Sequence, residues 1–206
     1  MESIELFTGA GGLALGTHLA GFHHRGLYEW DADACETLRG NARAEALRGI
    51  REWRVHQADV RINSYAIFGQ GHLDLVAGGA PCQPFSMGGK HQAQDDSRNM
   101  IPEFVRAVRE LQPRAFIMEN VKGLTRQSFR NYFEYIRLQL TYPTVTKKRE
   151  EDWVAHLHRL EEVKTKGRRK ELQYNVVSEL LNAAEDRKST RLNSSHSGES
   201  RMPSSA

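Results

Sequence analysis

The chain has 206 residues, of which 39% are hydrophobic and 27% are charged, and this composition is ordinary for a globular protein with one packed core. It contains no run of about eighteen apolar residues that could cross a membrane and no recognisable signal peptide, so we expect an intracellular, cytoplasmic protein. The two cysteines lack the spacing of a disulfide framework or a zinc site. The net charge of +3 neither identifies nor excludes a nucleic-acid binder.

Hydrophobic periodicity predicts strands that alternate with helices, which is typical of a parallel sheet covered by helices. The predicted strands are residues 4–7, 26–29, 55–59, 73–77, 114–118 and 174–181. The predicted helices are a first one that ends near residue 20, then residues 32–47, 100–111 and 129–140. Residues 141–171 mix basic and acidic side chains and predict an exposed helical insertion. Its basic cluster GRRK could contact phosphates or form a solvated face.

The first predicted strand leads into the glycine-rich segment TGAGGLALG, with glycines at positions 9, 11 and 12. Such a turn lets a ligand approach the backbone closely and points amide groups at it. A glycine-rich turn is weak evidence by itself, because a simple tight turn explains it equally well.

Acidic residues stand at the ends of the next two predicted strands, namely Glu29 and Asp59. Glu29 could accept hydrogen bonds from ribose hydroxyls, and the adjacent Trp30 could cover the face of a base. Asp59 could accept a hydrogen bond from an adenine amino group. The alternatives are an ordinary surface tryptophan beside a helix cap at Asp31, and a turn or cap aspartate at position 59.

Cys82 lies in the sequence LDLVAGGAPCQPFSMGGK, where an apolar strand leads into a stiff loop. Gly78 and Gly79 end the strand, and Pro81 and Pro84 fix the backbone on both sides of the cysteine. This places the thiol at the carboxyl end of a strand, where open α/β sheets bind their ligands. The alternative is a small buried hydrophobic residue, which we expect for the helical Cys35.

Glu119 follows the fifth predicted strand, within the tripeptide ENV. A carboxylic acid at the tip of a buried strand can donate a proton near neutral pH. A capping or ion-paired glutamate is the alternative explanation.

Taken together, these motifs resemble the C5-cytosine DNA methyltransferases. The segment ELFTGAGGLALGTHLAGF resembles the first motif of that family, PCQPFS resembles its nucleophile loop, and ENV resembles the motif that contacts the cytosine. The resemblance covers about residues 2–186. It implies an α/β, Rossmann-like S-adenosylmethionine-dependent methyltransferase fold that is incomplete at its C-terminal side, because the family's target-recognition domain has no counterpart here.

The resemblance also implies a role for each matching residue. The S-adenosylmethionine site would comprise Phe7, Gly9, Gly11, Gly12, Leu13, Glu29, Trp30, Asp59 and Pro81. Cys82 would add to C6 of a flipped-out cytosine, and Glu119 would protonate or hydrogen-bond N3 of the base. The base pocket would comprise Pro81, Gln83, Ser86, Glu119, Asn120 and Val121. No metal is implied.

The implied activity is that of a DNA (cytosine-5-)-methyltransferase of a restriction-modification system, with double-stranded DNA as its partner. We expect the chain to be inactive alone, since no recognition domain is present. An RNA methyltransferase that acts on tRNA and a non-catalytic cofactor-binding fragment are the alternatives. We expect residues 1–186 to form the catalytic domain and the serine-rich residues 187–206 to be a disordered, non-native tail. The sequence does not indicate an oligomeric state.

Overall fold

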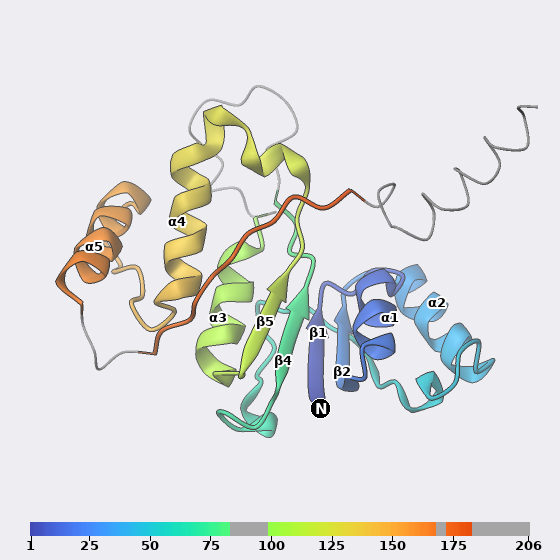
Figure 1. Ribbon diagram of the computed structural model, residues 1–206. Helices are drawn as coiled ribbons and strands as arrows, with labels where there is room; N and C mark the ends of the chain where they lie inside the picture. The colour runs from blue at the N-terminus through green and yellow to red at the C-terminus, as the bar shows by residue number, and fades with distance from the viewer. Residues whose placement is uncertain (83–98, 168–171, 183–206) are drawn as a thin grey trace, which may run out of the picture. The chain divides into compact units, whose positions relative to one another are not determined.

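The computed structural model describes three stretches of the chain, which are residues 1–82, 99–167 and 172–182. The chain divides into two compact units, residues 1–176 and residues 177–206. The helices and strands of the described chain all belong to the first unit (Figure 1). The expected tail at residues 187–206 lies outside the described residues, as does most of the GRRK cluster.

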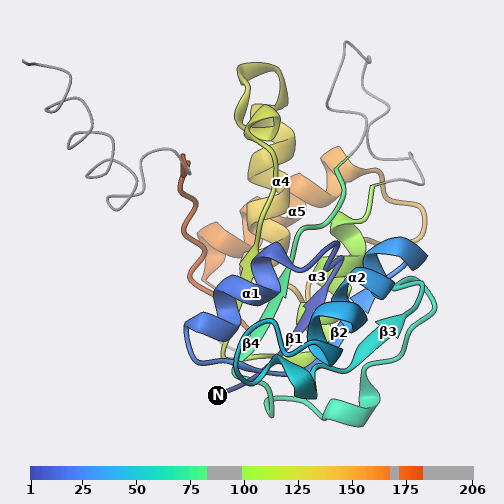
Figure 2. The same cartoon turned by 90° about the vertical axis from the view of Figure 1, so that its right-hand side faces the viewer.

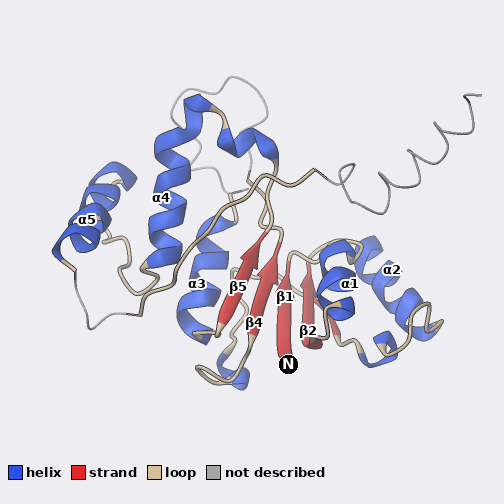
Figure 3. Cartoon of the chain, in the orientation of Figure 1, coloured by secondary structure: helices blue, strands red, loops and turns tan. Residues whose placement is uncertain are grey.

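Five parallel strands form one sheet in the order β3-β2-β1-β4-β5. Figure 3 shows β5, β4, β1 and β2 side by side, and β3 is labelled in Figure 2. The strands are β1 (Glu2–Leu6), β2 (His23–Glu29), β3 (Val55–Gln57), β4 (Leu75–Gly78) and β5 (Ala115–Met118). This order confirms the predicted Rossmann-like α/β class. The order in which strands are added reverses between β1 and β4, because β2 and β3 lie on one side of β1, whereas β4 and β5 lie on the other. Such a reversal opens a crevice at the carboxyl ends of β1 and β4.

Helices pack on both faces of the sheet (Figure 2). The helices are α1 (Gly12–Leu19), α2 (Ala32–Arg43), α3 (Ile101–Leu111), α4 (Arg130–Thr141) and α5 (Trp153–Lys166). Successive residues of a strand point to opposite faces of the sheet, so the packing of Leu27 and of Tyr28 in β2 shows which helices cover each face. Leu27 packs with Ala14 of α1 and Leu38 of α2, whereas Tyr28 belongs to the larger core formed with α3, α4 and α5.

The helix ends follow from local sequence. Asp31 caps α2 by accepting the N–H of Ala34 at 2.8 Å. The helix ends at Arg43, before the predicted residue 47, and Glu45 then takes a left-handed φ of 47°. The predicted apolar stripe of α3 is confirmed, since each of its residues is buried: Ile101, Phe104, Val105, Val108 and Leu111.

The predicted sixth strand at residues 174–181 is wrong, because residues 172–182 form no strand. The N–H of Tyr174 donates to the carbonyl of Thr141, just at the end of α4, at 3.0 Å. Its hydroxyl donates to the carbonyl of Pro113 at 2.7 Å, and Arg137 of α4 donates to the carbonyl of Val176 at 3.4 Å. These groups are bonded outside the sheet, so they form no ladder with a strand.

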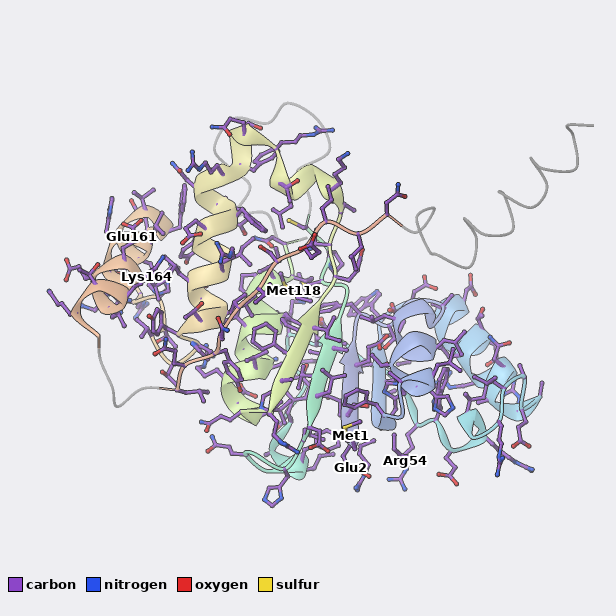
Figure 4. All side chains as sticks on the ribbon, in the orientation of Figure 1. Met1, Glu2, Arg54, Met118, Glu161 and Lys164 are labelled. Atoms are coloured by element: carbon purple, nitrogen blue, oxygen red, sulfur yellow. The ribbon has the colours of Figure 1, made fainter. Side chains whose placement is uncertain are left out.

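Part of the predicted insertion at residues 141–171 is helical, namely α5, whereas residues 168–171 lie outside the described residues, and the segment is not simply exposed. Helix α5 buries one side, formed by His156, Leu157, Leu160 and Val163. Its charged residues Glu161 and Lys164 remain exposed (Figure 4), and Lys164 pairs with Glu134 of α4 at 3.5 Å. No helix within the described ranges is long and apolar enough to span a membrane.

Candidate active site

The loops that follow β1, β2, β3 and β4 surround a cavity of about 610 Å³, a volume in the range of small-molecule sites. Its lining residues are Phe7, Gly9, Tyr28, Glu29, Trp30, Ala58, Asp59, Val60, Arg61, Gly79, Pro81 and Met100. The structure thus brings together most of the residues that the sequence predicts for a cofactor site. Parallel strands explain this result, because their carboxyl ends meet at one edge of the sheet.

Glu29 connects the end of β2 to the glycine turn after β1. Its Oε2 accepts the N–H of Gly9 at 2.7 Å, and its Oε1 accepts the N–H groups of Trp30 and Asp31 at 2.8 Å each. Three backbone donors therefore fix the carboxylate at the cavity wall. In the same turn Phe7 has a φ of 56°, a left-handed conformation that is unusual for a bulky residue and is often found at functional sites.

Gly11, Gly12 and Leu13 are not among the residues that line the cavity in the described chain. Gly11 has a packing role, because a Cβ at this position would come within 2.6 Å of Leu38 Cδ2 on α2. It also precedes α1 with a left-handed φ of 98°, which glycine adopts without strain. The cofactor-binding role of these three residues stays a prediction.

Asp59 and Arg61 form a bidentate ion pair at the cavity, with Arg61 Nε donating to Asp59 Oδ1 at 3.0 Å and Nη2 donating to Oδ2 at 2.6 Å. Hydrogen bonding from Arg61 lowers the pKa of Asp59 below its usual value. The Arg61 guanidinium also lies 5.8 Å from the centre of the Trp30 ring. Arg61 is not among the residues predicted from the sequence, although a cation two residues after a strand-end acid is a signal that can be read there.

Arg106 of α3 holds the loop that carries Asp59. Its guanidinium donates to the carbonyls of Val60 and Asn63, and it pairs with Glu103 at 2.7 Å. A second pair, with Glu110 at 2.9 Å, completes its bonding. Nothing in the sequence around Arg106 shows this contact, because it depends on how α3 packs beside the loop.

Cys82 is the last described residue before the gap at 83–98, and only 8% of it is exposed. Burial raises the pKa of its thiol to about 12, so the thiol is neutral at physiological pH. The two other predicted residues of this loop, Gln83 and Ser86, lie outside the described residues.

The turn after β5 is bonded to the segment that leads to Cys82. The N–H of Glu119 donates to the carbonyl of Gly78 at 3.0 Å, and Asn120 Nδ2 donates to the carbonyl of Ala80 at 2.9 Å. Glu119 Oε2 lies 3.2 Å from where a Cβ on Gly79 would be, so glycine leaves room for this carboxylate. The predicted acid is therefore beside the predicted nucleophile segment, and both Glu119 and Val121 are exposed.

Cys35 lies within α2, as predicted, and is fully buried. Its Sγ contacts the carbonyl of Glu29 at 3.6 Å, and burial raises the pKa of its thiol. Within residues 1–82, 99–167 and 172–182, no three His, Cys, Asp or Glu side chains are grouped as metal ligands would be.

Comparison with known proteins gives consistent matches. A sequence model of the family described as "C-5 cytosine-specific DNA methylase" matches residues 1–142. The Type II methyltransferase M.NgoMIV of Neisseria gonorrhoeae is 42% identical over 139 residues, which cover 66% of this chain and 41% of the relative. The Type II methyltransferase M.AquIA of Picosynechococcus is 37% identical over 162 residues, which cover 75% of this chain and 62% of the relative.

A solved structure of Spodoptera frugiperda DNMT2 is also similar, with a TM-score of 0.49 and 22% identity over 68% of this chain and 41% of that protein. The chain spans less than two thirds of the length of each of these relatives. The family match covers well over half of the chain, and the chain therefore belongs to the C-5 cytosine-specific DNA methylase family.

Proposed function

We propose that this chain is the cofactor-binding and nucleophile-bearing part of a DNA (cytosine-5-)-methyltransferase. One observation carries the proposal: the Cys82 segment and the Glu119 turn are bonded together, next to a cavity with two oriented carboxylates, in a chain of this family. The cytosine in duplex DNA would be flipped out of its stack to reach this site.

The cavity has the features that S-adenosylmethionine requires. Phe7 and Trp30 offer aromatic faces for adenine, and Asp59 offers an acceptor for its amino group. Glu29, oriented by three backbone donors, offers acceptors for the two ribose hydroxyls. When bound, S-adenosylmethionine supplies the electrophilic methyl group that C5 of the cytosine takes up.

The side chains near the cavity supply the rest of the chemistry. Addition of the Cys82 thiolate to C6 forms an S–C6 bond and makes C5 nucleophilic. Glu119 protonates or hydrogen-bonds N3, which offsets the negative charge that the thiolate brings into the ring. After methylation, a water molecule takes the C5 proton, the C5–C6 double bond re-forms as the S–C6 bond breaks, Cys82 leaves as the thiolate, and any proton given to N3 returns to Glu119.

The buried state of Cys82 adds a condition to this mechanism. Only the thiolate is nucleophilic, and burial raises the pKa of this thiol to about 12. The thiol must therefore lose its proton before it adds to C6 of the base.

Calorimetric titration of the purified chain with S-adenosylmethionine tests the cofactor site. We expect binding that Glu29→Gln weakens and that Cys82→Ser leaves unchanged, since Cys82 does not line the cavity. Absence of binding would overturn the proposed cofactor site.

A second assay identifies the substrate. The chain is combined with the C-terminal part of M.NgoMIV and tritiated S-adenosylmethionine, and methyl transfer is measured to duplex DNA and to tRNA in parallel. We expect label on DNA cytosine. Label on tRNA alone would assign the protein to the RNA substrate instead.

A further inference from the structure

A buried hydrogen bond connects α4 to the start of α3. Asn99 Nδ2 donates to the hydroxyl of Tyr132 at 2.7 Å, and each residue is 7% exposed. Asn99 Oδ1 in turn accepts the N–H of Ile101, the first residue of α3, at 3.3 Å. The amide of Asn99 is thereby fixed at both ends.

The bond lies close to Cys82. Met100, the neighbour of Asn99, donates its N–H to the carbonyl of Pro81 at 2.9 Å, so the two described backbone stretches that flank residues 83–98 are joined. Cys82 and Tyr132 belong to one hydrophobic cluster. Burial raises the pKa of Tyr132, the bond from Asn99 opposes this shift, and the nearby Cys82 thiol adds to it.

Helix α5 supports Tyr132 from its other side. The ring of Trp153 meets the ring of Tyr132 edge-on, with centroids 6.1 Å apart, and lies 5.8 Å from the ring of Tyr135. The hydroxyl of Tyr135 is bonded to His156 Nδ1 at 2.9 Å, and His156 Nε2 donates to the carbonyl of Val145 at 2.8 Å. The segment from residue 142 to residue 167 therefore holds α4, and with it Tyr132, in place.

A buried tyrosine often serves packing alone, with its hydroxyl bonded to whatever polar group is nearest. Two features of Tyr132 go beyond packing. Its partner Asn99 is 33 residues away in sequence, and that partner adjoins the backbone bond that fixes Pro81. Tyr135, one turn away on the same helix, bonds instead to His156 of α5 and offers a comparison.

We propose that Tyr132 is a positioning residue for Cys82. Tyr132 acts through its bond with Asn99 and through the backbone bond between Met100 and Pro81, and α5 supports Tyr132. The proposal rests on the nucleophilic role of Cys82 given above. Tyr132 touches no reacting atom; it fixes the segment from which the thiol projects and helps to keep the thiol buried.

Thiol alkylation tests the proposal without cofactor or DNA. In a Cys35→Ser background Cys82 is the only thiol, and its reaction with iodoacetamide is followed from about pH 7 to about pH 10. We expect Tyr132→Phe, which removes one hydroxyl and keeps the ring, to accelerate alkylation by about fivefold or more and to move the pH profile to lower pH, as the thiol becomes better solvated.

Tyr135→Phe is the matched control, because it removes the same atom from the same helix and aromatic cluster. It should change the rate and the pH profile of Cys82 far less than Tyr132→Phe does, because the bond from Tyr135 to His156 reaches Cys82 only indirectly, through the placement of α4. Asn99→Ala breaks the bond from the other side and should reproduce the effect of Tyr132→Phe, and the double variant should show little further change, since the two residues act as one unit.

Equal rates of Cys82 alkylation in the Tyr132→Phe and Tyr135→Phe proteins would overturn the proposal. An Asn99→Ala protein that is alkylated at the same rate as the Cys35→Ser protein would also overturn it. If Tyr132→Phe does not fold, Asn99→Ala decides alone. Failure of methyl transfer would count against the proposed function but not against this inference, since the alkylation measurement is independent of activity.

Discussion

The carboxylate of Glu29 accepts the backbone N–H of Gly9 at 2.7 Å, and this bond joins the end of β2 to the turn after β1. The two strands are neighbours in the sheet, with Leu6 opposite Tyr28. Glu29 therefore has two roles in our account, because it shapes the glycine turn and also faces the cavity.

Replacement of Glu29 by glutamine should weaken S-adenosylmethionine binding by about tenfold or more, because an NH₂ group then faces backbone donors and one ribose acceptor is lost. Titration calorimetry measures this affinity. Glu36→Gln is the control, since Glu36 lies exposed on α2 and pairs with Arg43 outside the cavity. Equal affinities of the two variants would remove Glu29 from the cofactor site.

Asp59 should determine the preference for adenine. Its carboxylate accepts hydrogen bonds, so it favours the 6-amino group of adenine and repels the 6-oxo group of hypoxanthine. We expect the chain to bind S-adenosylhomocysteine about tenfold or more tightly than S-inosylhomocysteine, and Asp59→Ala to abolish most of this difference. The exposed Asp33→Ala variant should keep it. A preference that survives in Asp59→Ala would place adenine elsewhere.

Glu5 should make the fold less stable as the pH rises. It is 1% exposed on β1, and burial raises its pKa to about 8, although a backbone bond from Ala14 opposes this shift. The folded state therefore holds a proton that the unfolded state loses near its ordinary pKa of about 4.3. The stability that this proton provides is complete below that pH and is lost as the pH rises toward about 8.

The Glu5→Gln protein has a side chain at position 5 that cannot ionise and is therefore neutral at every pH. We expect its Tm to exceed that of the parent by about 4 °C or more near pH 8 and the difference to shrink toward pH 6. Glu45→Gln, at an exposed position, should show no such trend. His24 acts in the opposite direction, since burial lowers its pKa and its contribution is lost only below about pH 6.5. A Tm difference that does not change with pH would contradict the assignment to Glu5.

Trp153 should stabilise the packing of α5 against α4. Its truncation to alanine removes the ring contacts with Tyr132 and Tyr135 and should lower the free energy of unfolding by about 2–4 kcal/mol. Urea unfolding measures the change. The neighbouring Val154 is 40% exposed, and Val154→Ala should cost far less. Similar losses for both variants would show that α5 does not depend on this contact.

The sequence predicted the strand ends well, because a parallel sheet brings every carboxyl end to one edge. That rule places Glu29, Asp59 and Pro81 around the cavity and Glu119 beside the Cys82 segment. The rule needs only the strand positions and their direction, which hydrophobic runs and glycine turns indicate.

What the sequence could not predict depends on contacts between distant segments. The bonds from Arg106 to the Asp59 loop and from Asn99 to Tyr132 span more than thirty residues, and no local pattern signals them. The apolar residues near Tyr174 favoured a strand, yet their polar groups bond to α4 and to Pro113 instead. The charges of α5 concealed its buried side, because a mixed-charge helix can still carry one apolar stripe.

The most direct test of the nucleophile is mass spectrometry of the covalent adduct with DNA. The chain, combined with the C-terminal part of M.NgoMIV, is incubated with S-adenosylmethionine and duplex DNA that contains 5-fluorocytosine. Fluorine at C5 blocks the proton loss that would release the enzyme, so the adduct persists. We predict a methylated adduct on the peptide that carries Cys82, and no adduct in the Cys82→Ser protein. An adduct on Cys35, or methyl transfer to ordinary cytosine that survives Cys82→Ser, would contradict the account.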